Sequence, residues 1–66
     1  MTIGDIIKTL RLENKMSQTQ LATLLFTSQD TISLWERNKS LPDVKSVIKM
    51  AEIFKVSTDY ILGVEK

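Results

Sequence analysis

Apolar residues recur along this chain three and four positions apart, which is the spacing of one face of an α-helix. The first stripe follows Thr2 and consists of Ile3, Ile6, Ile7 and Leu10. Thr2 is suited to the N-cap because its hydroxyl accepts a bond from a free N–H of the first turn, and Asp5 completes a capping box. The pattern predicts a helix that begins after Thr2 and ends at Asn14-Lys15.

Four further stretches are organised in the same way. Each follows an N-cap residue, and the four caps are Ser17, Ser28, Asp43 and Ser57. The residues expected on the buried faces are Leu21, Leu24 and Leu25; Ile32 and Trp35; Val44, Val47, Ile48, Ala51 and Phe54; and Val56, Ile61 and Leu62. Pro42 interrupts the pattern before the fourth helix, and Gly63 ends the fifth. No stretch alternates as a strand would, so the fold class is all-α, a compact five-helix domain.

The second and third predicted helices are separated only by a few residues around Phe26-Thr27. Two helices so joined must turn sharply, and the small side chain of Ala22 permits their close approach. Ala22, Ile32 and Trp35 would form the seam between them. This arrangement is typical of a helix-turn-helix, here residues 17–37, in which the second helix enters the DNA major groove.

Composition limits the other possibilities. The 66 residues are enough for one domain, 1–66, and contain no Cys and no His, which excludes disulfides and Cys- or His-based metal sites. We therefore expect no metal and no cofactor. We also expect no catalytic residue, because the chain has no glycine-rich phosphate loop and no clustered carboxylate pair.

Apolar runs do not exceed three residues and no signal peptide is evident, so we expect a cytoplasmic protein without a membrane span or small-molecule substrate. The net charge of +1 argues mildly against DNA, so the case depends on layout.

The chain resembles the Cro/phage-repressor (Xre) family in two runs, Ser17-Gln18-Thr19-Gln20-Leu21-Ala22 and Ser28-Gln29-Asp30-Thr31-Ile32-Ser33-Leu34-Trp35-Glu36-Arg37-Asn38-Lys39. The resemblance extends to Arg11, Pro42 and residues 56–62, and it implies a lambda-repressor-like fold that binds double-stranded DNA. Phe26, Lys15 and Asn38 stand where the family often has Gly. Because a bulky residue in a left-handed conformation costs about 1 kcal/mol or more, we expect the turn at Phe26 to be shaped differently.

The outward face of the third helix would meet the bases. It comprises Gln29, Asp30, Ser33 and Leu34. Gln can pair with adenine N6 and N7, and the resemblance implies that Gln29 reads a base while Gln18 binds phosphate and braces Gln29. Asp30 could accept from cytosine N4 or simply favour the positive end of the helix dipole. Leu34 could contact a thymine methyl group or pack within the protein.

Residues 17–34 carry only one charged side chain, that of Asp30. Phosphate contacts must therefore come from neutral donors, from N–H groups that open the two helices, and from flanking cations. The expected set is Ser17, Gln18, Ser28, Thr31, Arg37, Asn38 and Lys39. The resemblance further implies a structural ion pair between Arg11 and Glu36.

Base contacts from one such domain are too few for high specificity, so we expect a homodimer that reads two half-sites about one helical turn apart. Tyr60 and Val64 are the candidates for a self-complementary dimer interface, with packing on the domain's own core as the alternative. The leading interpretation is a sequence-specific transcriptional regulator that acts as a repressor. An interaction module that kept the fold without reading DNA, an antitoxin and a restriction-controller protein are the alternatives.

Overall fold

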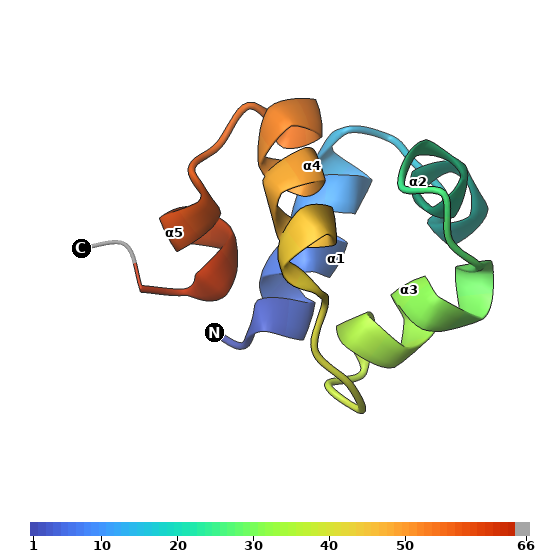
Figure 1. Ribbon diagram of the computed structural model, residues 1–66, viewed down its shortest axis with the longest axis horizontal. Helices are drawn as coiled ribbons and strands as arrows, with labels where there is room; N and C mark the ends of the chain where they lie inside the picture. Colours follow the sequence, from blue (N-terminus) through green and yellow to red (C-terminus); the bar gives the residue numbers. More distant parts are fainter. Residues whose placement is uncertain (65–66) are drawn as a thin grey trace.

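The computed structural model describes residues 1–64, which form five helices and contain no strand. The helices are α1 (Ile3–Glu13), α2 (Gln18–Leu24), α3 (Gln29–Glu36), α4 (Val44–Phe54) and α5 (Thr58–Leu62). Figure 1 shows α1 and α4 in the middle of the molecule, with α2 and α3 on one side and α5 on the other. The predicted all-α, five-helix fold is confirmed.

All five helices begin at the predicted caps. The side chains of Thr2, Ser17, Ser28, Asp43 and Ser57 each accept a hydrogen bond from the backbone N–H three residues on. The backbone N–H of Thr2 donates to Asp5 and holds the pKa of this carboxyl below its usual value. The hydroxyl of Ser46 does the same to the pKa of Asp43. Local chemistry therefore fixes where each helix starts.

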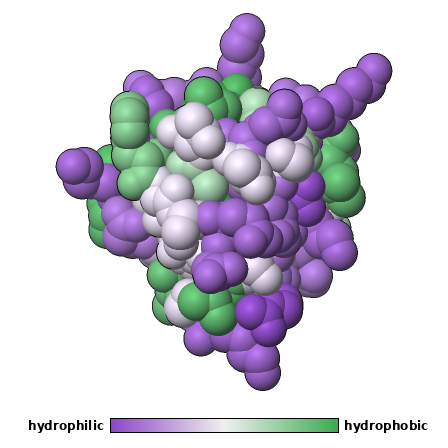
Figure 2. Space-filling model, turned by 90° about the vertical axis from the view of Figure 1, so that its right-hand side faces the viewer, coloured by the Kyte–Doolittle hydropathy of each residue, from purple (hydrophilic) through white to green (hydrophobic). Residues whose placement is uncertain are grey.

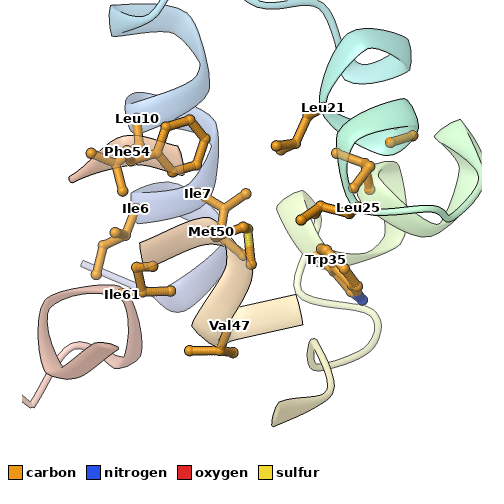
Figure 3. Packing of buried hydrophobic residues seen from close by; sticks show 12 residues of the cluster. Ile6, Ile7, Leu10, Leu21, Leu25, Trp35, Val47, Met50, Phe54 and Ile61 are labelled. Atoms are coloured by element: carbon orange, nitrogen blue, oxygen red, sulfur yellow. The ribbon is translucent and has the colours of Figure 1, made fainter. Parts of the chain in front are cut away.

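The core lies in the middle of the domain, between α2 and α3 on one side and α5 on the other. In Figure 3, Ile7 and Met50 are central, with Ile6, Leu10, Phe54 and Ile61 toward one side and Leu21, Leu25 and Trp35 toward the other. The remaining core residues are Ala22, Ile32 and Val47. Fully buried Met50 was missed by the sequence analysis, although its spacing from Val47 and Phe54 is helical.

Four residues that were predicted to be buried are exposed: Leu24, Val44, Ile48 and Leu62. On α4 the buried face contains Ser46, Val47, Met50 and Phe54, so it is rotated from the predicted stripe toward Met50. The periodicity found a helix correctly but could not decide which of two adjoining apolar faces its neighbours cover.

The turn between α2 and α3 was predicted to change shape at Phe26, and this prediction is wrong. Phe26 has a φ of +57°, and Lys15, Asn38 and Lys55 also have positive φ. The backbone N–H groups of Phe26 and Thr27 donate hydrogen bonds to the carbonyl oxygens of Thr23 and Ala22, respectively. These two bonds end α2, and they form only when Phe26 has a positive φ. Because the Phe26 side chain is 94% exposed, its packing offsets little of the backbone strain.

We predict that Phe26→Gly raises the free energy of unfolding by about 0.5–1 kcal/mol, because Gly has no Cβ to oppose a positive φ and its greater unfolded-state entropy offsets only part of the gain. Urea unfolding measures the change. Phe26→Ala is the matched control, since it removes the ring and keeps the Cβ. Equal stability of the Gly and Ala variants would show that the turn stores no strain.

Candidate nucleic-acid interface

The α2–turn–α3 unit is held together by the seam that the sequence predicted. Ala22, Ile32 and Trp35 are all buried within the core cluster. Because the face of α3 that carries Ile32 and Trp35 is buried in the core, the first turn and the opposite face of that helix point to solvent. Gln29, Asp30 and Leu34 are exposed there and Ser33 is half-buried. All four predicted base-reading residues therefore remain accessible.

A buried ion pair joins α3 to α1. Arg11 Nε donates to Glu36 Oε2 at 2.7 Å, and Arg11 Nη2 donates to Glu36 Oε1 at 3.0 Å. Their side chains are only 8% and 4% exposed. Arg11 Nη1 also donates to the carbonyl of Met16 at 2.8 Å, just before α2. The pair implied by the resemblance is thus formed, and it fixes three segments of the chain relative to one another.

Gln18 connects this ion pair to the exposed start of α3. Its Nε2 donates to Glu36 Oε1 at 3.1 Å, and its Oε1 accepts a short hydrogen bond from Gln29 Nε2. We call the four residues Arg11, Glu36, Gln18 and Gln29 the polar chain. It runs from the interior of the domain to the surface, so the two glutamines do not move independently.

Arg37 lies against the predicted base-reading face. Its Nε donates to the Ser33 carbonyl at 3.3 Å and to Ser33 Oγ at 3.1 Å. The guanidinium is therefore folded back along α3. Lys39 is exposed just beyond the helix, where its backbone N–H donates to Leu34. Both predicted phosphate-binding cations consequently remain close to α3.

Asn38 has a structural role that the sequence did not suggest. Its Oδ1 accepts from the Gly4 backbone at 3.1 Å, and its Nδ2 donates to Thr2 Oγ1 at 3.0 Å. A Cβ on Gly4 would lie only 2.5 Å from the carbonyl oxygen of Trp35, so this contact requires Gly. The end of α3 is thus seated directly on the start of α1. A phosphate contact by Asn38 stays a prediction.

The remaining predicted phosphate ligands stand at helix starts. The hydroxyl of Ser17 caps α2, and Ser28 Oγ lies 2.9 Å from Thr31 Oγ1 at the start of α3. Figure 2 views the molecule from the α2–α3 side, and hydrophilic side chains gather in the middle of this face. Along α2 and α3 the only charged side chains are those of Asp30 and buried Glu36. Anion binding there must use neutral donors and adjacent cations.

The predicted dimer residues lie elsewhere. Tyr60 and Val64 are 40% and 60% exposed. α5 and α2–α3 stand at opposite ends of the view in Figure 1. Within residues 1–64, no helix is long and apolar enough to cross a membrane, and no group of three or more acidic side chains could hold a metal ion.

Residues 7–61 match the model of a protein family described as "Helix-turn-helix". Among curated proteins, the chain is 32% identical over 63 residues to the HTH-type transcriptional regulator ImmR of Bacillus subtilis, covering 96% of this chain and 50% of ImmR. It is 32% identical over 66 residues to the HTH-type transcriptional activator BcrR of Enterococcus faecalis, covering 100% of this chain and 32% of BcrR. The chain thus spans half or less of these relatives.

Solved structures agree with this match. The P22 c2 repressor in complex with a synthetic operator has a TM-score of 0.90 at 26% identity, with 98% of both chains covered. SinR, described as the master regulator for biofilm formation and solved in complex with DNA, has a TM-score of 0.83 at 29% identity. The match covers 92% of this chain and 98% of that of SinR.

We predict that Glu36→Ala lowers the free energy of unfolding by about 3–5 kcal/mol, because it leaves the Arg11 guanidinium buried without its partner. Thermal and urea unfolding measure the loss. Glu52→Ala, an exposed change on α4, is the control and should differ from wild type by less than about 0.5 kcal/mol. A melting temperature for Glu36→Ala equal to that of the control would mean that the ion pair does not hold α1 and α3 together.

Proposed function

The chain belongs to the helix-turn-helix family, and from that membership we propose that it binds double-stranded DNA sequence-specifically as a transcriptional regulator. α3 is the recognition helix and enters the major groove. The observation that carries the proposal is the polar chain, which anchors the exposed Gln29 to a buried ion pair. A surface glutamine without a recognition role would need no such anchor.

The relatives support this function. The P22 c2 repressor and SinR were solved with DNA, and both match almost the whole chain. ImmR and BcrR are a transcriptional regulator and a transcriptional activator. We propose repression, because a domain seated in the groove excludes other proteins from the same site. The proposed activity uses no catalytic residue and no cofactor.

The contacts divide into two classes. Gln29, Asp30, Ser33 and Leu34 read base edges, since they form the outward face of α3. Gln29 meets adenine, Asp30 meets a cytosine amino group, and Leu34, which is 38% exposed, meets a thymine methyl group. The phosphates are bound by Ser17, Gln18, Ser28, Thr31, Arg37, Asn38 and Lys39. The two cations supply the long-range attraction, because α2 and α3 contribute no positive charge.

The protein acts as a homodimer through its α5 end. Tyr60 and Val64 are exposed apolar residues, and Leu62, which was expected to be buried, is also 40% exposed. The helix α5 stands away from α2 and α3 in Figure 1, so a two-fold pairing through the α5 end leaves both recognition helices free. Two half-sites then supply the specificity that one domain lacks.

An interaction module that kept the fold without reading DNA is the second candidate, and the net charge of +1 is the observation that favours it. Titration with duplex DNA at increasing salt separates the two functions. We predict binding that weakens with salt, and we predict that Arg37→Ala and Lys39→Ala each reduce the slope of log K against log salt by about one unit per half-site contact. Lys55→Ala, far from α3 in the sequence, should leave the slope unchanged.

Salt-independent binding, or no binding to duplex DNA at low salt, would favour the interaction module. Unchanged slopes for both variants would instead move the phosphate contacts to other residues.

For the dimer, we predict that Tyr60→Ala combined with Val64→Asp abolishes self-association and cooperative binding to a two-site duplex while the monomer stays folded. The new carboxylate would be desolvated and like-charged across the two-fold axis, which costs more than the lost contacts alone. Sedimentation velocity and operator titration measure the two effects. Leu12→Asp, an exposed apolar site on α1, is the matched control. A dimer retained by the double variant and lost by the control would place the interface on α1.

A further inference from the structure

Arg37 continues the outward face of α3 beyond its last helical residue. Gln29, Ser33 and Arg37 follow one another at intervals of four residues, so they lie on the same face of the helix. Arg37 is the C-cap of α3, and its backbone N–H still donates to the Ser33 carbonyl at 3.0 Å. The face expected to read bases is therefore followed directly by an arginine.

The Arg37 side chain is folded back toward the start of the helix. Its Nε donates to both oxygens of Ser33, which holds the guanidinium level with that residue. Residues four apart in an α-helix are separated by about 6 Å along the axis, so the fold-back carries the positive charge about this far toward the N-terminal turns. Those turns are the part of a recognition helix that meets base edges.

The bond to Ser33 also determines which donors of Arg37 remain available. A guanidinium carries one N–H on Nε and two on each Nη, all in one plane. Nε is used by Ser33, and within residues 1–64 no hydrogen bond or ion pair engages either Nη. Because Arg37 is exposed, its two Nη groups present a planar fork of donors to the outside.

A fork of parallel N–H donors matches one base. In the major groove guanine presents two acceptors, N7 and O6, whereas adenine places a donor beside its N7 acceptor. We propose that Arg37 reads a guanine through its two Nη groups, and that Ser33 is the positioning residue that aims the guanidinium. The inference rests on the proposed DNA binding and adds a base preference to it. One N–H on each Nη is left for a phosphate, so Arg37 still contributes to the salt dependence of binding.

The first test compares guanine with adenine at one position of the binding site. Selection from randomised duplexes gives the preferred sequence of the wild-type protein, and the position at which Arg37→Ala loses its preference is the one that Arg37 reads. We expect the wild-type protein to prefer guanine there about 10-fold, within the range of one good bidentate contact, and Arg37→Ala to bring the ratio close to one. Lys39→Ala is the matched control, because it removes the same charge two residues away, and its ratio should be unchanged.

A change in the DNA separates a base contact from a phosphate contact. The analogue 7-deazaguanine lacks the N7 acceptor but keeps the backbone charge and the pairing with cytosine. At the mapped position it should weaken binding by the wild-type protein and by Lys39→Ala about 5-fold, the effect of one lost hydrogen bond, and should leave Arg37→Ala unaffected.

Ser33 is tested at the position that Arg37 reads. Ser33→Ala removes the hydroxyl and keeps the carbonyl bond, so the guanine preference there should fall to about 3-fold. Ser33→Thr keeps the hydroxyl and should restore the wild-type ratio. A residue that only stabilised α3 would change the affinity for all duplexes and leave this ratio unmoved.

The inference is overturned, with DNA binding intact, if Arg37→Ala weakens binding to all sequences equally and 7-deazaguanine has no effect on the wild-type protein. Arg37 is then a phosphate contact only. A ratio in Ser33→Ala equal to that of the wild-type protein would overturn the positioning role of Ser33. If the wild-type protein selects no sequence at all, the proposed base reading itself fails. Thermal unfolding of each variant confirms that folded protein was titrated.

Discussion

The ion pair between Arg11 and Glu36 is the constraint on which the rest of this structure depends. It links α1, the residues before α2 and α3 through three hydrogen bonds of 2.7 to 3.0 Å. A buried pair adds little net stability over well-packed apolar residues, but the loss of one partner is strongly destabilising. Its effect here is to permit a single arrangement of these segments. The position of α3 is therefore set by directional bonds as well as by packing.

The apolar core supplies the cohesion that the ion pair does not. A domain of 66 residues buries only about 60% of the surface that its unfolded chain exposes, so its core alone stabilises the fold only marginally. It compensates with a capped start to every helix and with close approaches such as Gly4 against α3. Left-handed residues at Lys15, Phe26, Asn38 and Lys55 end the helices within a few residues. Strain at these points is the consequence of so many short helices.

The helices were predictable because each start depends on chemistry within four residues. The buried faces were less so: Met50 and Ile48 are both apolar, and only the packing of α4 decides which is covered. Gly4 and Asn38 were missed as a contact because they are 34 residues apart and neither carries a periodic signal. A glycine in the first turn of an otherwise regular helix was the available clue. At Phe26 the sequence misled, because the seam around Ala22 forces a turn that the residue itself disfavours. In the candidate site, the link from Gln18 to Gln29 came from resemblance, while that from Gln18 to Glu36 needed the fold.

Fold and proposed recognition thus share one network, in which a buried carboxylate is hydrogen-bonded through Gln18 to the amide at the start of α3. A crystal structure of this chain on its preferred duplex tests this most directly. The account predicts α3 in the major groove, with the Gln29 amide on an adenine edge and the bonds from Gln18 to Glu36 and Gln29 unchanged from the free protein. An α3 that faces away from the duplex, or a Gln18 that leaves Glu36 while Gln29 still binds adenine, would contradict it.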